Sequence, residues 1–177
     1  MCVDKANVFR SFWFFREIFE QRAENFPDVK TSAMYVDAAA MKMVHSPWEL
    51  DVMVTENMFG DILSDLGAGL MGSLGLAPSA DIGLDHAVFQ PCHGSAPDIA
   101  GQGLANPTAM FLSAAMMLDW LAEKHHSASA AKAAHCITLA VDNAFATGRL
   151  RTCESGGDSG LDDVTNAVFD ALDALDI

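Results

Sequence analysis

Segments with a helical apolar period alternate along this chain with short apolar runs of strand length. The spacing of apolar residues predicts helices over 8–26, 37–44, 59–70, 107–124, 128–147 and 162–175, and strands over 31–36, 50–55 and 87–89. Apolar residues make up 51% of the sequence and charged residues 19%, so the chain can form a packed core. Strands that alternate with helices indicate an α/β architecture.

A glycine-dense stretch over 67–83 divides the chain and is the expected boundary between two partial lobes, 1–72 and 73–177. No Gly-x-Gly-x-x-Gly motif follows a predicted strand, so a Rossmann fold is not supported. The apolar stripe of the first helix, Val8 to Phe26, is wider than a half-buried helix needs. Two explanations remain open: this helix is buried on two sides, or another chain covers part of it.

The net charge of the chain argues against two classes of binding partner. A net charge of −14 would be repelled by a nucleic-acid backbone or an anionic membrane surface, so neither is expected as a partner. The four cysteines are widely spaced and form no Cys-x-x-Cys pair, and no apolar run has the length of a membrane span. These features favour a reducing, cytoplasmic location.

Two aspartates at the start of the third predicted helix are candidate metal ligands. Asp61 and Asp65 are four positions apart, so both carboxylates lie on one helix face. Mg²⁺ and Mn²⁺ prefer oxygen ligands and accept such a pair, although a solvated helix face is the simpler explanation of the pair taken alone. Asp37 is a third candidate ligand or a helix N-cap. Lys5 is a surface charge, or a proton shuttle if it is desolvated near a metal.

A second group of candidates lies in the loop His93 to Gly101. Its small residues let a ligand approach the backbone, and free N–H groups can hold a pyrophosphate. The carboxylate of Asp98 can accept hydrogen bonds from a ribose and would repel a 2′-phosphate, which favours NAD over NADP. An ordinary turn is the alternative.

Four ordered motifs resemble one known family: Lys5-Ala6-Asn7-Val8, Met34 to Met41, Thr55 to Asp65, and His93 to Pro107. They are similar to the β-decarboxylating dehydrogenases, the isocitrate/isopropylmalate dehydrogenase family, and most similar to its 3-isopropylmalate branch. The resemblance implies the C-terminal half of the isopropylmalate dehydrogenase-like α/β fold, which is not a Rossmann fold. Residues 1–72 would belong to the dimerisation and metal-binding lobe, and residues 73–177 to the NAD-binding lobe.

The resemblance also implies roles for individual residues. Asp61 and Asp65 would bind Mg²⁺ or Mn²⁺ in one subunit. Lys5 and Asp37 would reach that site from the partner subunit of a homodimer, with Lys5 moving the proton. Asn7 would lie near the nicotinamide and Val8 near the variable group of the substrate. The adenosine half of NAD would be held by His93, Gly94, Ser95, Ala96, Pro97, Asp98, Ile99 and Asn106.

The implied reaction is NAD-dependent oxidation of a 2-hydroxy acid, followed by loss of its β-carboxylate with the metal as Lewis acid. The expected substrate is 3-isopropylmalate, in leucine biosynthesis. Tartrate or D-malate, homoisocitrate and isocitrate remain open as substrates within the family. A non-catalytic module that forms a homodimer or pairs with a second chain is the alternative from another class.

The sequence departs from the family pattern in three respects. The part that would carry the substrate-binding arginines, the proton-donating tyrosine and the first strands of the cofactor lobe has no counterpart here. Gln90 stands where the family commonly has a glutamate before Pro-x-His-Gly, and Glu154 stands near a usual Thr-x-Asp-Leu-Gly-Gly segment. Without those arginines the two carboxylates of the substrate have no counter-charges, so the chain is expected to be the second half of such an enzyme, and its activity alone is in question.

Overall fold

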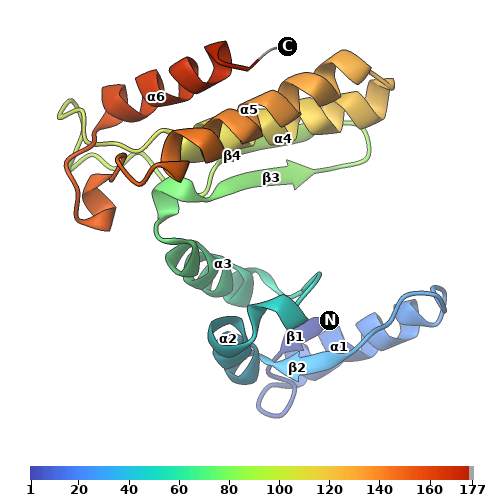
Figure 1. Cartoon of the computed structure of the whole chain (residues 1–177). Coiled ribbons are helices and arrows are strands. Elements are labelled where there is room, and N and C mark those ends of the chain that lie inside the picture. The colour runs from blue at the N-terminus through green and yellow to red at the C-terminus, as the bar shows by residue number, and fades with distance from the viewer. Residues whose placement is uncertain (176–177) are drawn as a thin grey trace. The chain divides into compact units, whose positions relative to one another are not determined.

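The computed structural model describes residues 1–175, which divide into two compact units. The first unit spans Met1–Leu70 and the second begins at Met71 (Figure 1). Each unit contains one two-stranded sheet with helices packed against it. The roles expected of the two lobes, metal binding with dimerisation and NAD binding, stay predictions.

The first unit is organised by a parallel pair of short strands. Strands β1 (Cys2–Asp4) and β2 (Ala33–Tyr35) pair in register, with Cys2 opposite Ala33 and Asp4 opposite Tyr35. The helices of this unit are α1 (Arg10–Ala23), α2 (Val36–His45), the 3₁₀ turn η1 (Pro47–Glu49) and α3 (Asn57–Met71). Its buried core consists of Val3, Ala39, Met43 and Leu63.

Two sequence-based expectations for this unit are wrong. The sequence predicts no strand at the start of the chain, yet Cys2, Val3 and Asp4 form β1 with all three residues fully buried. The predicted strand over 50–55 forms only one isolated bridge, between Val54 and Cys2. The apolar run misleads because the side chain of Val52 is 74% exposed and does not join the core.

The start of α2 also differs from the prediction. The helix begins at Val36 and the residue before it, Tyr35, occupies the N-cap position without a capping side chain. Asp37 lies in the first turn instead of at the cap, and its carboxylate accepts a hydrogen bond from Lys5. An acidic side chain in this position still interacts favourably with the positive end of the helix dipole.

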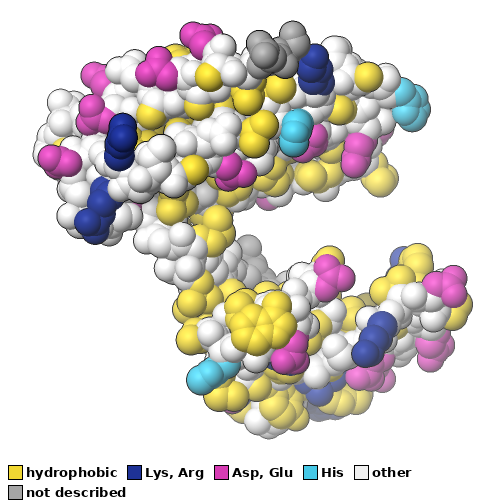
Figure 2. All heavy atoms as spheres, viewed as in Figure 1, with side chains coloured by type: hydrophobic (Ala, Val, Ile, Leu, Met, Phe, Trp, Pro, Cys, Tyr) yellow, Lys and Arg dark blue, Asp and Glu magenta, His cyan; other side chains and the backbone are white. Residues whose placement is uncertain are grey.

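Helix α1 carries the wide apolar surface that its sequence suggested. It has no buried residue, so burial on two sides within this chain is wrong. Phe9, Trp13 and Phe14 are each more than half exposed, whereas Phe12 contacts the ring of Phe59 with centroids 4.9 Å apart. One apolar edge of α1 therefore packs on its own unit and the rest faces outward. Figure 2 shows hydrophobic side chains at the surface of both units.

The second unit is an antiparallel hairpin covered by a layer of helices. Strands β3 (Pro78–Ile82) and β4 (Ala87–Pro91) pair from Pro78 with Pro91 to Ile82 with Ala87. Helix α4 (Thr108–His125) packs on both strands and on α5 (Ala128–Ala146), and α5 packs on α6 (Leu161–Asp173). Short 3₁₀ turns η2 (Leu74–Leu76) and η3 (Cys153–Ser155) precede β3 and α6.

Helix packing supplies the core of the second unit. Ala140, Val141 and Val168 are buried where α5 meets α6, and partly buried Phe111 of α4 packs against them. Strand β3 was not predicted, because its sequence Pro-Ser-Ala-Asp-Ile follows the glycine-dense stretch and lacks an apolar alternation. No helix among residues 1–175 has the length and apolar character needed to cross a membrane.

Candidate functional site

The first candidate site lies at the ends of the two parallel strands. Asp4 and Tyr35 are paired as the last residues of β1 and β2, so Lys5 and the start of α2 emerge side by side. The ammonium group of Lys5 donates a hydrogen bond to a carboxylate oxygen of Asp37 and forms an ion pair with it. The carboxyl ends of parallel strands are where α/β proteins commonly place reactive side chains.

The charges of this pair are stabilised by contact and stay open to solvent. The hydrogen bond from Lys5 lowers the pKa of Asp37, which keeps the carboxylate ionised. The side chain of Asp37 is 66% exposed and that of Lys5 is 25% exposed. Both groups can therefore meet a molecule that arrives from outside this unit.

The two expected metal ligands on α3 also face outward. Asp61 and Asp65 are exposed and lie four positions apart on the helix, and the Nδ2 atom of Asn57 is 3.4 Å from a carboxylate oxygen of Asp61. This pair of carboxylates suits a hard divalent cation as part of a ligand set. Among residues 1–175, no three acidic, histidine or cysteine side chains converge as a complete metal site, so one chain does not bring Asp37 together with this pair.

Two further predicted residues lie in the turn that follows β1. Asn7 and Val8 are exposed, with Val8 58% exposed. The backbone N–H of Val8 donates to the carbonyl oxygen of Lys5 at 2.9 Å, which closes the turn. This geometry presents both side chains on the surface of the first unit, next to Lys5 in sequence.

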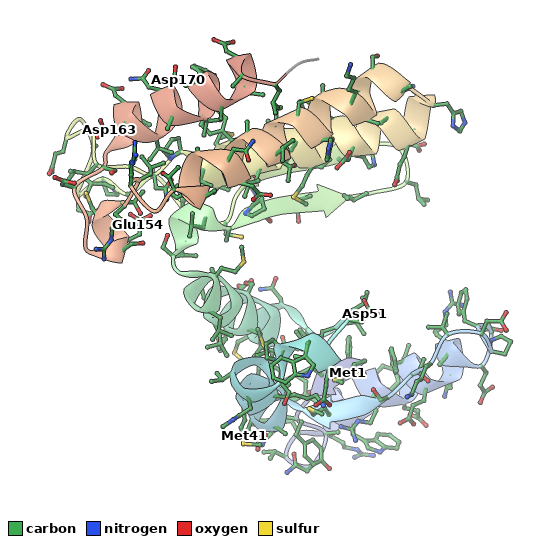
Figure 3. The ribbon with its side chains drawn as sticks, in the orientation of Figure 1. Met1, Met41, Asp51, Glu154, Asp163 and Asp170 are labelled. Carbon is green, nitrogen blue, oxygen red and sulfur yellow. The ribbon has the colours of Figure 1, made fainter. Side chains whose placement is uncertain are left out.

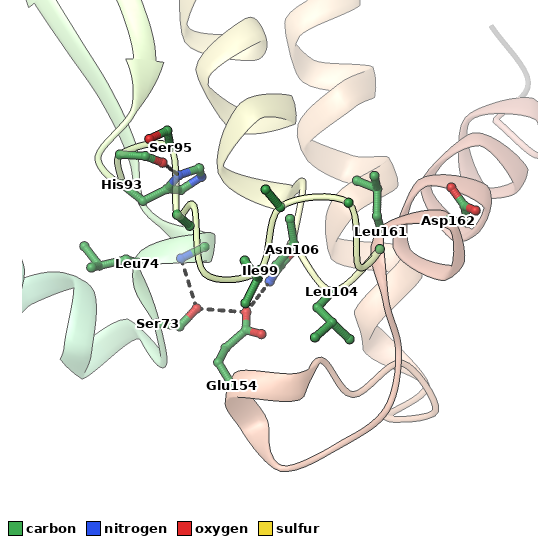
Figure 4. Close-up of a pocket in the computed structure, with 17 residues that line it drawn as sticks. Ser73, Leu74, His93, Ser95, Ile99, Leu104, Asn106, Glu154, Leu161 and Asp162 are labelled. Carbon is green, nitrogen blue, oxygen red and sulfur yellow. Dashed lines mark hydrogen bonds between the residues drawn. The ribbon is translucent and has the colours of Figure 1, made fainter.

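A pocket of about 680 Å³ lies within the second unit (Figure 4). It brings together the predicted residues His93, Gly94, Ser95, Ala96, Ile99 and Asn106. Pro97 and Asp98 belong to the same loop but do not line the pocket, and Asp98 is exposed. The loop bends sharply at Ala96, whose φ of 42° is in the left-handed region.

The carboxylate of Glu154 anchors one wall of this pocket. It accepts hydrogen bonds from Asn106 Nδ2 at 2.7 Å and from Ser73 Oγ at 3.0 Å (Figure 4). Burial acts to raise the pKa of Glu154, but the hydrogen bonds, led by the one from Asn106, lower it. The side-chain oxygen of Asn106 accepts in turn from the backbone N–H and the hydroxyl of Thr108, at 3.0 and 2.6 Å.

Close packing at this wall requires a glycine. A Cβ atom on Gly75 would lie 3.0 Å from Cβ of Asn106 and 3.1 Å from a carboxylate oxygen of Glu154. Such contacts are tighter than ordinary van der Waals packing, so a side chain at position 75 would press against the Asn106–Glu154 hydrogen bond. The wall therefore depends on residues from three separate segments of the chain.

Sequence reasoning missed a large share of the pocket lining. The missed residues are Ser73, Leu74, Gly75, Gly103, Leu104, Ala105, Leu161 and Asp162, and Glu154 was noted only as a departure from a motif. The glycine-dense stretch that contains Gly75 was a signal of close backbone approach, although it was read as a lobe boundary. Leu161 and Asp162, at the start of α6, carry no local signal.

The chain matches the family model described as Isocitrate/isopropylmalate dehydrogenase over residues 1–168. It is 47% identical over 171 residues to a 3-isopropylmalate dehydrogenase of Pseudomonas putida, covering 96% of this chain and 47% of that protein. It is 51% identical over 161 residues to an isocitrate/homoisocitrate dehydrogenase of Thermus thermophilus, covering 91% of this chain and 46% of that protein.

Solved structures agree with these relatives. The crystal structure of isocitrate dehydrogenase from Methylococcus capsulatus matches with a TM-score of 0.87 and 43% identity, over 97% of this chain and 49% of that chain. The predicted α/β fold class is therefore confirmed. The chain spans about half the length of the curated relatives it matches.

Proposed function

The chain belongs to the isocitrate/isopropylmalate dehydrogenase family, and on that premise we propose that it supplies the NAD- and metal-binding half of a β-decarboxylating dehydrogenase. The observation that carries the proposal is the pocket of the second unit, in which the loop from His93 to Asn106 forms one wall. A pocket of several hundred cubic ångströms with apolar walls and a few polar groups is typical of a small-molecule cofactor site.

The pocket suits the adenosine half of NAD. Leu74, Ile99 and Leu104 give apolar walls that can contact a flat ring, and Glu154 and Asn106 provide polar atoms at one side. Asp98 lies in the same loop, outside the pocket. Its carboxylate is exposed and can accept hydrogen bonds from the hydroxyl groups of a ribose. A negative charge in this loop favours NAD over NADP because it repels a 2′-phosphate.

Asp61, Asp65 and Asp37 would hold Mg²⁺ or Mn²⁺, since carboxylate oxygens are the ligands these ions prefer. When bound, NAD⁺ supplies the hydride acceptor and the divalent cation supplies the Lewis acid for loss of the carboxyl group. The remaining step of the reaction is proton transfer, which we assign to Lys5. Its ammonium group, held by Asp37, can donate a proton to the carbanion of the substrate, and the neutral amine can accept one from the hydroxyl.

The metal site is proposed to form between two copies of the chain. Exposed apolar side chains surround the acid pair on α3, with Met58 54% and Ile62 59% exposed. On α2, Met41 is 62% and Val44 56% exposed, and Figure 3 shows Met41 projecting from its helix. Apolar helix faces of this kind are typical of subunit interfaces. In the proposed homodimer, Lys5 and Asp37 of one copy lie beside Asp61 and Asp65 of the other.

The proposed substrate is a 2-hydroxy acid with a β-carboxylate. Our first candidate for it is 3-isopropylmalate. The exposed side chain of Val8 supports a substrate with an apolar variable group. A relative named isocitrate/homoisocitrate dehydrogenase favours those two acids as alternatives. Tartrate and D-malate are further alternatives within the same reaction class. With 3-isopropylmalate as substrate, the reaction would belong to leucine biosynthesis in the cytoplasm.

A titration of the purified chain with NAD⁺ and with NADP⁺ tests the cofactor proposal, with heat or intrinsic fluorescence as the readout. We expect saturable NAD⁺ binding and weaker NADP⁺ binding. Asp98→Asn should strengthen NADP⁺ binding by about tenfold, the effect of about 1.4 kcal/mol of removed repulsion. Asp85→Asn, at an exposed aspartate of the β3–β4 turn, is the matched control. Equal binding of both dinucleotides by the parent chain, or no binding at all, would contradict the proposal.

A second candidate function is a non-catalytic partner module. The exposed aromatic side chains of α1 favour it, because an exposed apolar surface of this kind is typical of a site that binds another protein. Addition of isopropylmalate to the chain with Mn²⁺ and NAD⁺ tests whether the chain is an enzyme by itself. NADH formation would support the enzyme, and binding of both cofactors without NADH would support the module or an enzyme that needs a further chain.

A further inference from the structure

An ion pair with a fully buried carboxylate lies next to Lys5 in the chain. Asp4 is fully buried, and its two carboxylate oxygens accept hydrogen bonds from Arg16 Nε at 2.7 Å and from Arg16 Nη2 at 2.8 Å. A guanidinium group that contacts both oxygens of a carboxylate is fixed in direction as well as in distance. Because α1 supplies Arg16 and β1 supplies Asp4, this pair locks the helix to the end of the strand.

The same carboxylate holds the backbone around Lys5. One oxygen of Asp4 also accepts from the backbone N–H of Ala6 at 2.8 Å, so the chain is clamped on both sides of Lys5. The carbonyl oxygen of Lys5 accepts in turn from Val8 and Phe9, at 2.9 and 3.2 Å. Three hydrogen bonds therefore fix the turn around Lys5, two of them at its own carbonyl oxygen, and they restrict the direction in which its side chain leaves the turn.

The partner of Lys5 is held through Tyr35. The guanidinium carbon of Arg16 is 5.0 Å from the centroid of the Tyr35 ring, and Lys5 Nζ is 5.7 Å from it. Cations at this distance are attracted to the face of an aromatic ring. Tyr35 stands two positions before Asp37 and pairs with Asp4 in the sheet. The guanidinium of Arg16 thus contacts both Asp4, which precedes Lys5, and Tyr35, which lies two positions before Asp37.

We propose that Asp4 and Arg16 are positioning residues, which hold Lys5 and Asp37 in contact through the turn after β1 and the ring of Tyr35. Neither residue is assigned contact with a ligand. The proposal deepens the proposed function, because it matters for catalysis only if Lys5 moves the proton. The arrangement of Lys5 can nevertheless be measured without turnover, so the two proposals can fail separately.

Lys42 offers a matched internal control for this measurement. It lies in the same unit, forms an ion pair with Glu49, and its side chain is 25% exposed, the same fraction as that of Lys5. Local unfolding of the unit would expose both lysines. Loss of positioning would free Lys5 alone.

The experiment compares the acetylation rates of Lys5 and Lys42 at one pH by peptide mass spectrometry. The main variant is the double substitution Asp4→Asn with Arg16→Gln, which removes both charges of the pair together, so that neither is left unpaired. We expect the Lys5 rate to rise about fivefold, the factor that corresponds to a contact at the upper end of surface ion pairs, with the Lys42 rate unchanged. Tyr35→Phe, which keeps the ring, should leave both rates unchanged.

Two results would overturn the proposal. An unchanged Lys5 rate in the double variant would show that the ion pair does not position this side chain. A parallel rise of Lys5 and Lys42 would assign Asp4 and Arg16 a structural role only. If circular dichroism shows that the double variant does not fold, Arg16→Lys gives the same readout. It keeps a cation beside Asp4 but cannot reproduce the two-point contact, so the Lys5 rate should again rise alone.

Discussion

The ammonium group of Lys5 donates a hydrogen bond to the carboxylate of Asp37, which lies 32 positions further along the chain. The contact exists because each residue closely follows the end of one of two parallel strands whose last residues are paired. An ion pair this exposed contributes little to the stability of a fold. Its value is chemical, since it holds two charged groups at a surface that another molecule can reach.

Replacement of Glu154 should weaken the pocket wall. Glu154→Ala leaves the buried side chain of Asn106 without the acceptor for its Nδ2 group. An unpaired buried donor costs about 1–2 kcal/mol, so the free energy of unfolding should fall by roughly that amount in urea denaturation. Glu123→Ala, at an exposed glutamate of α4, is the control and should have no measurable effect. Equal stability of the two variants would contradict this account of the wall.

The contribution of Glu154 should also depend on pH. Hydrogen bonds lower its pKa in the folded chain below the value of 4.5 for an unperturbed glutamate, despite the opposing effect of burial. The stabilisation is therefore present above pH 4.5 and is lost as the pH falls through the lowered pKa of the folded state. The difference in unfolding free energy between the parent and Glu154→Gln should shrink in acid. A difference that stays constant from pH 7 to strong acid would contradict the assignment.

Cys2 should be the least reactive thiol of the chain. It is fully buried, and burial, together with the charge of Asp4, raises its pKa from 9.0 to about 11. Cys92 is exposed and should react with iodoacetamide first, as peptide mapping at pH 8 can show. Labelling of Cys2 at the rate of Cys92 in the folded chain would contradict the structure. In urea both thiols should react.

The raised pKa of Cys2 predicts an effect on stability in alkali. A thiol whose pKa is raised by folding stabilises the folded state below the unfolded pKa, and this contribution is lost as the pH rises through the folded value. The unfolding free energy should therefore decline between about pH 9 and 11 more steeply in the parent than in Cys2→Ala. Identical pH profiles would show that Cys2 does not take part.

A charge on the exposed face of α3 should prevent assembly. Ile62 is 59% exposed beside Asp61, and we expect the parent chain to have twice its mass of 18.9 kDa by light scattering. Ile62→Glu should yield the monomer, because a desolvated carboxylate at an apolar interface is costly. Leu84→Glu, at a 99% exposed leucine of the β3–β4 turn, is the control and should leave the mass unchanged. A dimer that survives Ile62→Glu would place the interface elsewhere.

The helices could be predicted because their apolar residues recur with a regular period, and the bounds of α3, α4 and α5 lie within two residues of those expected. The predicted strands over 31–36 and 87–89 overlap β2 and β4, but β1 and β3 could not be predicted. Strand β1 has three residues, too few to show an alternation, and β3 begins with a proline. Their existence depends on pairing with segments that are distant in sequence.

The site residues also divide into those that the sequence could predict and those that it could not. The loop from His93 to Asn106 could be recognised because its residues are contiguous and its glycines have a local meaning. The contacts of Glu154 with Ser73 and Asn106 could not, because they join positions separated by 81 and 48 residues. The burial of Asp4 likewise follows from the packing of α1 on β1, which no local pattern encodes.

A titration with Mn²⁺, followed by electron paramagnetic resonance, tests the central proposal most directly. We expect about one ion per chain, bound by carboxylate oxygens. The double substitution Asp61→Asn with Asp65→Asn should abolish binding, and Asp37→Asn should weaken it in the parent but not in the Ile62→Glu monomer. Asp119→Asn, at an exposed aspartate of α4, should bind like the parent. Mn²⁺ binding that is the same in the parent and in the Asp61/Asp65 double variant would contradict a shared metal site.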